Sequence, residues 1–283
     1  MHQVSSLLEK VRYSKELIRC WYEAWDGKVY VSFSGGRDST VLLHLVRTMF
    51  PEVPGVFCNT GLEYPEIVSF VKATPNVITV RPKMPFHKVV EKYGWPVVSK
   101  EQSQFISELR TTKSQSLRAT RTDGNRWGKG KVSEKWKFLV DAPFKVSHLC
   151  CKKLKKDPMN LFCRESGLHP MMGNMAAESS RRATTAARYS CNAYECKRPT
   201  SKPMTYWAQE DVKEYIRIAG IPYSSIYDMG YDRTGCMFCL YGVHLNNPNK
   251  IQVLNQTHPK QWDFIVNTMG AGEVLDYIKV PKQ

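Results

Sequence analysis

The sequence predicts an α/β protein with a parallel, twisted sheet and helices on both of its faces. From about residue 4 to residue 80, short runs of β-favouring apolar residues alternate with stretches in which apolar residues recur at helical spacing. The chain has 283 residues, of which 42% are hydrophobic, so it can bury a full core. Strands that alternate with helices in this way form parallel sheets whose crossovers are helical.

The elements are expected in a regular order along the chain. Apolar residues at helical spacing predict a helix over residues 4–24, packed on the first strand. The elements expected after it are a strand at 29–33, a helix at 39–49, a strand at 54–58, a helix at 64–73 and a strand at 77–80. Ligands of such sheets bind beyond the carboxyl ends of the strands, and the turns at 34–39 and 59–61 fall there.

The turn after the first strand reads Ser34-Gly35-Gly36-Arg37-Asp38-Ser39. Its two glycines allow a sharp backbone turn that brings N–H groups close to an anion. We expect Ser39 or Asp38 to cap the following helix, whose N-terminus favours negative charge. The loop is not a Walker loop, because no Gly-Lys-Ser/Thr follows at the required spacing, and an ordinary strand–turn–helix junction is the alternative.

This string resembles the pyrophosphate-binding loop of the adenine nucleotide α-hydrolase superfamily, and similar stretches extend from about Val29 to Gly242. The superfamily includes ATP pyrophosphatases, sulfonucleotide (APS and PAPS) reductases and several thiolation enzymes. The chain resembles most of all the PAPS reductase-like family and its iron–sulfur subgroup. The resemblance implies an adenine nucleotide α-hydrolase-like sheet, chemistry at the α-phosphate, and ATP with Mg²⁺ as cofactors.

The resemblance also implies roles for individual residues. Asp38 would contact Mg²⁺, and Arg37 or Arg181 would stabilise charge that develops on the phosphates, so these three are the candidate catalytic residues. The residues expected to bind the nucleotide are Ser34, Gly35, Gly36, Asp38, Ser39, Asn59, Thr60, Gly61, Glu178 and Ser179.

A later stretch, residues 172–182, resembles a family element that usually reads Gly-x-Arg-x-x-Glu-Ser with a later arginine. Glu178 and Ser179 match this element, and either Arg181 or Arg182 supplies the later arginine. Met175 stands where the first arginine is expected. The phosphate-binding role of that arginine therefore does not transfer directly to this chain.

The nine cysteines are an odd number in a chain without a secretory signal, which argues against a disulfide framework. Cys20 and Cys58 lie in apolar surroundings and are expected to be small core residues. Two pairs stand out, one of adjacent cysteines at 150–151 and one of the form Cys-x-x-Cys at 236–239. A two-residue gap lets two thiolates reach one metal centre, although such a pair alone is also typical of a redox dithiol or half of a zinc site.

Iron–sulfur APS reductases hold a [4Fe–4S] cluster with a Cys-Cys pair and a distant Cys-x-x-Cys pair. The resemblance therefore implies that the ligands of such a cluster are Cys150, Cys151, Cys236 and Cys239. A structural zinc site is the alternative. Cys191 and Cys196 match no ligand motif and stay unassigned.

The charge of the chain points to an anionic partner. Its 41 Lys and Arg exceed its 26 Asp and Glu, for a formal net charge of +15. Residues 100–137 hold ten Lys and Arg against four Asp and Glu, with Trp127 and Trp136 among them. One interpretation is a solvated insertion, and the other is an arm that contacts the phosphates of RNA or DNA while Trp127 stacks on a base.

No apolar run approaches the length of a membrane span, and the N-terminus lacks the pattern of a secretory signal. We therefore expect a cytoplasmic protein without a membrane partner. Three parts are expected along the chain: residues 1–99 as an N-terminal helix and nucleotide-binding α/β half, 100–137 as a basic insertion, and 138–283 as the remainder of the α/β domain with the cluster-binding region.

Three functions compete. The first is an ATP-dependent enzyme that adenylates a substrate, most readily a nucleic acid, for sulfur transfer from a donor protein. The second is a sulfonucleotide reductase whose nucleophile comes from Cys191, Cys196 or another chain, because no cysteine follows Cys239, where these reductases carry a nucleophilic one. The third is a non-catalytic accessory protein that binds nucleotide and nucleic acid and holds a structural cluster.

Overall fold

The computed structural model describes residues 6–283, which form two compact units. The first unit consists of the residues up to Asn59, of Glu63–Arg81 and of Pro158–Thr234. The second consists of Thr60–Leu62, Pro82–Asp157 and Gly235–Gln283. Val4, the first apolar residue of the expected N-terminal helix, lies outside the described residues.

The first unit is built on a six-stranded sheet in the order β3-β2-β1-β5-β7-β6. All neighbouring strands are parallel except the last pair, β7 and β6, which is antiparallel. The strands are β1 (Val29–Ser32), β2 (Gly55–Cys58), β3 (Val77–Val80), β5 (His169–Met171), β6 (Asn192–Ala193) and β7 (Thr200–Ser201). The predicted α/β class with a mostly parallel sheet is confirmed.

The strand order reverses at β1, and this reversal positions the site. Val31 of β1 pairs with Gly55 of β2 on one side and with Met171 of β5 on the other. The chain therefore leaves β1 and β5 at the same edge of the sheet and next to each other. Crevices at such reversal points are where open α/β sheets bind their ligands.

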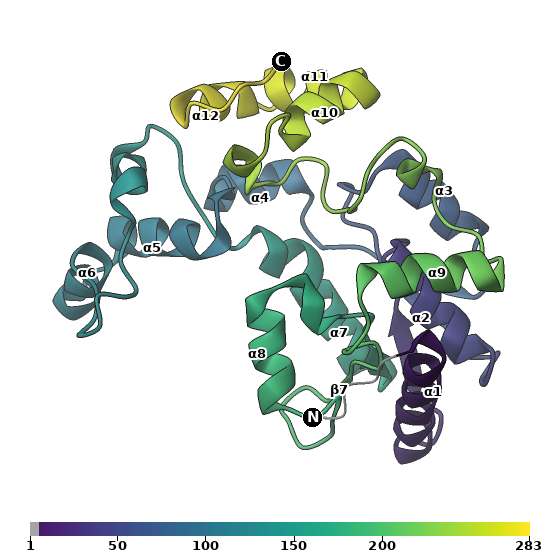
Figure 1. Ribbon diagram of the computed structural model, residues 1–283. Helices are drawn as coiled ribbons and strands as arrows, with labels where there is room; N and C mark the ends of the chain where they lie inside the picture. The colour runs from purple at the N-terminus through teal and green to yellow at the C-terminus, as the bar shows by residue number, and fades with distance from the viewer. Residues whose placement is uncertain (1–5) are drawn as a thin grey trace. The chain divides into compact units, whose positions relative to one another are not determined.

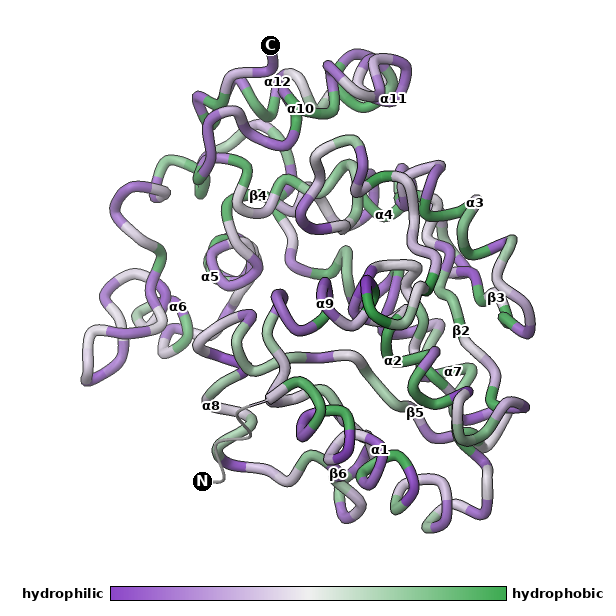
Figure 2. The backbone as a smooth tube through the Cα atoms, turned by 45° about the vertical axis from the view of Figure 1, so that its right-hand side comes forward, coloured by the Kyte–Doolittle hydropathy of each residue, from purple (hydrophilic) through white to green (hydrophobic). Residues whose placement is uncertain are grey.

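Helices cover both faces of this sheet, and α1, α2 and α9 lie side by side in Figure 1. Apolar side chains such as Ile18, Leu42 and Trp207 are almost fully buried, and Figure 2 shows the largely apolar course of α2. The Trp207 indole N–H donates to the Ser14 hydroxyl at 2.9 Å, which ties the segment before α9 to α1. The helices are α1 (Leu7–Ala24), α2 (Arg37–Arg47), α3 (Pro65–Ala73), α7 (Asp157–Ser166), η3 (Ala176–Glu178), α8 (Ser180–Arg188), α9 (Gln209–Ala219) and η4 (Ser225–Tyr227).

Two local expectations are wrong. Helix α2 begins at Arg37 with Gly36 as its N-cap, so neither Asp38 nor Ser39 caps it. The Ser39 hydroxyl instead donates back to the Gly36 carbonyl at 2.9 Å, because a residue in the first turn of the helix can reach that oxygen. Cys20 is exposed and is not a core residue, since it lies on the outer side of α1, whose buried residues are Ser14, Ile18 and Trp21.

The second unit is mainly helical and contains a short parallel pair of strands. Val97 of β4 pairs with Leu240 of β8. Its elements are α4 (Phe86–Tyr93), β4 (Val97–Val98), α5 (Lys100–Thr111), α6 (Gln115–Thr122), η1 (Glu134–Asp141), η2 (Lys152–Lys156), β8 (Leu240–Tyr241), η5 (Val243–Leu245), α10 (Lys250–Thr257), α11 (Pro259–Asp263), η6 (Phe264–Thr268) and α12 (Ala271–Tyr277). Among residues 6–283, no helix has the length and apolar character needed to cross a membrane.

Candidate functional site

The loop between β1 and α2 has the backbone that its glycines predict. Gly35 has a φ of +74°, and a Cβ there would lie 2.8 Å from the Val71 Cγ2 and 2.9 Å from the Ile67 Cγ2. A side chain at this position would therefore clash with α3 as well as strain the backbone. The sharp turn directs the loop onto the N-terminus of α2, the end of a helix that favours an anion.

The serines of the loop hold it in shape. The Ser39 hydroxyl accepts from the Ser34 backbone N–H and lies 3.1 Å from the Ser34 hydroxyl. The Ser34 hydroxyl in turn accepts from the Gly36 N–H at 3.3 Å. On the other side, the Tyr227 hydroxyl accepts from the Arg37 backbone N–H at 3.0 Å. The loop is thus preorganised by its own side chains and by a tyrosine from η4.

A pocket of about 280 Å³ opens at this loop, and all of its lining belongs to the first unit. It brings together six residues of the predicted site, namely Ser34, Gly36, Arg37, Asp38, Ser39 and Glu178. Sequence reasoning did not assign seven other polar residues of its lining, which are Ser32, Asn174, Gln209, Tyr227, Asp232, Arg233 and Thr234. Asn174 and Gln209 each lie in a stretch that the resemblance had singled out, although neither was assigned a role.

Asp38 is the central carboxylate of this pocket. Burial raises its pKa, while a hydrogen bond from Gln209 and the charges of Arg233, Arg37 and Arg182 act in the opposite direction. The Gln209 amide lies 3.4 Å from the Asp38 Oδ1. A half-buried carboxylate held among arginines is suited to bind a divalent cation together with phosphate groups.

The arginines differ in how they are held. The Arg37 guanidinium stacks 3.9 Å from the centre of the Tyr227 ring and donates to the Asp232 carbonyl at 3.2 Å. Arg182 forms an ion pair with Glu178. Burial and the positive charge of the nearby Arg233 lower the pKa of Arg182. Cationic charge is therefore concentrated in a part of the pocket that is shielded from water. An anionic ligand would relieve this repulsion.

The element at residues 178–182 supplies Arg182 to the pocket at the loop between β1 and α2, which we call the phosphate pocket. Ser179 caps α8 by accepting from the Arg182 backbone N–H at 3.3 Å, and the Glu178 carboxylate accepts from the Met175 N–H at 3.1 Å. Arg181 is exposed and lines a neighbouring pocket instead. Of the two arginines considered from the sequence, Arg182 is therefore the one that this structure places beside Asp38.

The turn after β2 is placed differently from the loop after β1. Asn59 ends the strand, with its N–H donating to the Val80 carbonyl at 2.9 Å, and Thr60 is buried. Asn59, Thr60 and Gly61 are not among the residues that line the phosphate pocket. Their role in nucleotide binding stays a prediction.

The four predicted cluster ligands gather in the second unit. Burial raises the pKa of the Cys150 thiol, and the nearby thiols of Cys151, Cys236 and Cys239 raise it further. The two cysteine segments are linked, because the Tyr241 hydroxyl donates to the Ser147 carbonyl at 3.4 Å. Within residues 6–283, however, no group of three or more His, Cys, Asp or Glu side chains is arranged to hold a metal ion.

A lysine lies against this cysteine group. The Lys250 ammonium is within hydrogen-bonding reach of the Cys239 thiol and donates to the Tyr241 carbonyl at 3.1 Å. Across the part of the chain that the structure describes, no carboxylate forms an ion pair with it. A largely desolvated cation without a carboxylate is suited to a site whose thiols carry negative charge.

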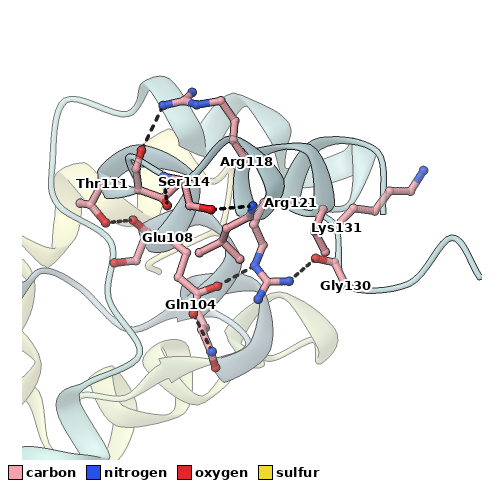
Figure 3. Close-up of polar contacts among 12 residues, drawn as sticks. Gln104, Glu108, Thr111, Ser114, Arg118, Arg121, Gly130 and Lys131 are labelled. Atoms are coloured by element: carbon pink, nitrogen blue, oxygen red, sulfur yellow. Dashed lines mark hydrogen bonds and ion pairs between the residues drawn. The ribbon is translucent and has the colours of Figure 1, made fainter. Parts of the chain in front are cut away.

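The basic insertion at 100–137 is mostly helical. Arg121 is held inside it, donating to the Glu108 carboxylate and to the Gly130 carbonyl, both at 2.6 Å, with its guanidinium 4.2 Å from the Phe105 ring (Figure 3). Arg118 points away from this cluster and reaches only the Thr112 carbonyl at 3.5 Å (Figure 3). The exposed cations of the insertion are Lys100, Arg110, Lys113, Arg118, Arg126, Lys129, Lys135 and Lys137.

Comparison with known families finds a match over the stretch that holds the loop and most of the sheet. The model of the phosphoadenosine phosphosulfate reductase domain matches residues 28–107 and 96–241, which is most of the chain. The fold and the site define a nucleotide-binding α/β protein of the PP-loop class. The chain belongs to the phosphoadenosine phosphosulfate (PAPS) reductase domain family.

Individual relatives are distant. An uncharacterized protein of Methanocaldococcus jannaschii is 25% identical over 89% of this chain, and the chain spans only 43% of that protein. The adenosine 5'-phosphosulfate reductase of Halalkalibacterium halodurans is 22% identical over 84% of this chain and 85% of its own length. Among solved structures, the PAPS reductase of Candida auris in complex with phosphate is 18% identical, with a TM-score of 0.46, over 79% of this chain and 87% of its own.

Proposed function

We propose that this protein is an ATP-pyrophosphatase-type enzyme that adenylates a substrate for sulfur transfer, with nucleic acid as the substrate class. One observation carries the proposal: the phosphate pocket combines the glycine loop and the N-terminus of α2 with Asp38 and three arginines. A loop with two glycines at a helix N-terminus binds phosphates, and arginines beside a carboxylate suit a metal-bound polyphosphate.

In the proposed reaction, an oxygen of the substrate attacks the α-phosphorus of ATP. The bond to the bridging oxygen breaks and pyrophosphate leaves with the electron pair. A sulfur nucleophile at the oxidation level of sulfide, brought by a donor protein, then attacks the substrate atom that bears this oxygen. The bond between that atom and the oxygen breaks, and AMP leaves with the oxygen and the electron pair. The loop residues hold the β- and γ-phosphates, Asp38 holds Mg²⁺, and Arg37 and Arg182 stabilise the charge that develops on the phosphates.

Cys150, Cys151, Cys236 and Cys239 are proposed to hold a [4Fe–4S] cluster, which would bind or relay sulfur. The residues fit such a group, because four thiols neighbour one another beside a cation, Lys250. A zinc ion bound by the same thiols is the alternative. A cluster of several irons accepts thiolates that lie further apart.

The basic insertion is proposed to contact the backbone of RNA or DNA. Its cations Lys113, Arg118, Arg126 and Lys129 are exposed, and Trp127 is 65% exposed with the Arg126 guanidinium 3.9 Å from its ring. Cations that interact with phosphates next to an exposed aromatic ring are typical of single-strand binding surfaces. Arg118 lies on α6, and Lys113, Arg126, Trp127 and Lys129 lie in the loops that flank this helix.

The test combines three measurements on anaerobically purified protein. We expect iron and sulfide in the preparation, binding of Mg-ATP by calorimetry, and pyrophosphate release that depends on added nucleic acid. Cys236→Ala should remove the iron, while Cys20→Ala is the matched control, because Cys20 is exposed on α1 in the other unit. Zinc in place of iron would overturn the cluster, and the lack of adenine nucleotide binding would overturn the whole proposal.

A second candidate function is the reduction of a sulfonucleotide with Cys191 as nucleophile. Cys191 lines a pocket next to the phosphate pocket, and the two pockets share Asn174 and Arg182 in their linings. In this reaction the Cys191 thiolate would attack the sulfur, the S–O bond would break and AMP or its 3'-phosphate would leave. A second thiol would then release sulfite. Sulfite formed from APS or PAPS, and lost in Cys191→Ser but not in Cys20→Ser, would favour it over ATP-dependent sulfur transfer.

The third candidate, an accessory protein that binds nucleotide and nucleic acid without turnover, makes a different prediction. It requires tight binding of both ligands and neither pyrophosphate nor sulfite release. The same set of assays therefore separates the three candidates.

A further inference from the structure

The second unit contains a cleft that neither the phosphate loop nor the cysteine group explains. It has a volume of about 900 Å³ and is lined by residues of η1, of η5 with the loop after it, and of the end of α12 with the residues that follow. This volume lies within the range of about 300–1,000 Å³ that is usual for small-molecule sites. We call it the aromatic cleft and define it by Lys135, Trp136, Phe138, His244, Tyr277 and Lys279.

Aromatic rings form one wall of the cleft. The Trp136 and Phe138 ring centroids are 6.0 Å apart, and those of Phe138 and Tyr277 are 5.6 Å apart. Trp136 is buried, with its ring 4.8 Å from that of His244, whereas Phe138 is 40% exposed. A half-exposed ring that packs against the buried Trp136 ring and the partly buried Tyr277 ring is a surface on which a planar group can stack.

Polar side chains without a hydrogen-bond partner among residues 6–283 belong to the lining of the same cleft. The Nδ1 of His244 is buried and has no hydrogen-bond partner among residues 6–283. Asn246 and Asn247 also line the cleft, are exposed, and have side chains that form no hydrogen bond within that range. The neighbouring Asn249 is different, because its side chain caps α10 at the Ile251 N–H, at 2.9 Å.

The charge of the cleft is of one sign. Lys135 and Lys279 belong to its lining, and no Asp or Glu does. The basic insertion belongs to the same unit and contributes Lys135 directly. A ligand that matches this cleft therefore has a flat apolar face, an edge with hydrogen-bonding groups, and negative charge beside it.

We propose that the aromatic cleft binds an unpaired base of a single-stranded nucleic acid, with the base stacked on Phe138 and its edge read by Asn246 and Asn247. Lys135 and Lys279 contact the adjoining phosphates. This inference rests on the proposed function, because it assigns to the nucleic-acid substrate a site that selects unpaired bases. It also explains why a cleft with unpaired amides lies in the unit that carries the basic insertion.

The test uses full-length protein and fluorescein-labelled single-stranded 12-mers of RNA and of DNA, followed by fluorescence anisotropy at several salt concentrations. Phe138→Ala should weaken binding about tenfold, as expected for the loss of one stacked base. The slope of log K against log salt should not change, because stacking releases no counterions. Phe264→Ala is the matched control, since Phe264 is 46% exposed in the same unit and outside the cleft.

Two further measurements separate a role of the cleft from a general loss of stability or of phosphate contacts. The double variant Asn246→Ala, Asn247→Ala removes only exposed amides, so it should weaken binding without lowering the melting temperature. A 12-mer with abasic sugars keeps the phosphates, and Phe138→Ala should bind it as the wild type does. If the wild type binds natural 12-mers and all cleft variants match it, the cleft proposal is overturned while the proposed function stands. If the wild type binds no 12-mer of either kind, the nucleic-acid substrate itself is overturned.

Discussion

Removing the charges of Arg118 and Arg126 should weaken nucleic-acid binding without unfolding the second unit. Both side chains are exposed, and neither forms an ion pair with a carboxylate within residues 6–283. If each contacts one phosphate of a single strand, the double alanine variant should lower the slope of log K against log salt by about 1.4. At 1 M salt the variant and the wild type should bind equally, because the contribution of counterion release vanishes there. At 0.1 M salt, one decade lower, a slope reduced by about 1.4 therefore corresponds to about 25-fold weaker binding of the variant.

Arg121 should behave differently, although the sequence offers no reason to separate it from the other two. Its guanidinium is largely buried against Glu108, Gly130 and Phe105. Charge-assisted hydrogen bonds contribute about 1.5–3 kcal/mol and a cation–π contact about 0.5–2 kcal/mol, and the two are not additive. We therefore expect Arg121→Ala to reduce the free energy of unfolding by about 2–4 kcal/mol.

The assay is anisotropy of a labelled single strand between 50 and 400 mM salt, together with urea unfolding followed by circular dichroism. Arg12→Ala, Arg19→Ala is the matched control, because it removes two exposed arginines of α1 in the first unit. An unchanged slope in the Arg118, Arg126 variant, or a slope lowered equally in the control, would refute the assignment of the insertion. Unchanged stability in Arg121→Ala would refute the structural role of that side chain.

Three further predictions concern the two sites. Gly35→Ala should lower the free energy of unfolding by about 2–3 kcal/mol and abolish nucleotide-dependent thermal protection, because its φ is +74° and its Cβ would meet Val71 and Ile67. Gly220→Ala, at a φ of +60° with open space around it, should cost only about 1 kcal/mol in the same scan. Asp38→Asn should abolish Mg²⁺-dependent turnover yet stabilise the metal-free protein at pH 7. Burial raises the pKa of Asp38 in the folded protein above its value in the unfolded chain. Ionisation of Asp38 therefore lowers the free energy of unfolding as the pH rises from the unfolded pKa to the folded pKa. The stability that Asp38→Asn gains should disappear below both pKa values, where Asp38 is protonated in either state. Melting temperatures at pH 3 and pH 7 check this, and an equal effect at both values would contradict it. If the proposed cluster is bound, Lys250→Met should lower its reduction potential, because the change removes a cation beside Cys239, whereas Lys250→Arg should retain most of the potential. EPR-monitored titrations of both variants decide the matter, and a potential unchanged in Lys250→Met would show that Lys250 does not act on the centre.

The phosphate loop was predictable because its function depends on local backbone geometry. Only glycine, which has no side chain, fits the turn at Gly35. The sequence shows this requirement, because the glycines of residues 34–39 stand between an apolar strand and an apolar helix. The parallel sheet was predictable for a similar reason, since strand–helix alternation leaves few ways to order neighbouring strands. The four cysteines could be grouped by spacing and resemblance, and the structure places them in one unit.

The remainder of the site depends on contacts between residues far apart in the chain. Tyr227 reaches the Arg37 N–H and Gln209 reaches Asp38 across more than 170 positions, and no local pattern records such pairings. The sequence could not distinguish Arg181 from Arg182, because these neighbours point about 100° apart around α8 and only the packing of the helix decides which guanidinium faces Asp38. Nor could it show that Arg121 is structural and Arg118 exposed, since both are arginines in one basic stretch and only packing against Glu108 and Phe105 separates them. The sequence by itself thus determined the α/β class and the phosphate loop, through local backbone and spacing constraints, and only the tertiary structure decided which charged side chains face a ligand and which are held by other side chains.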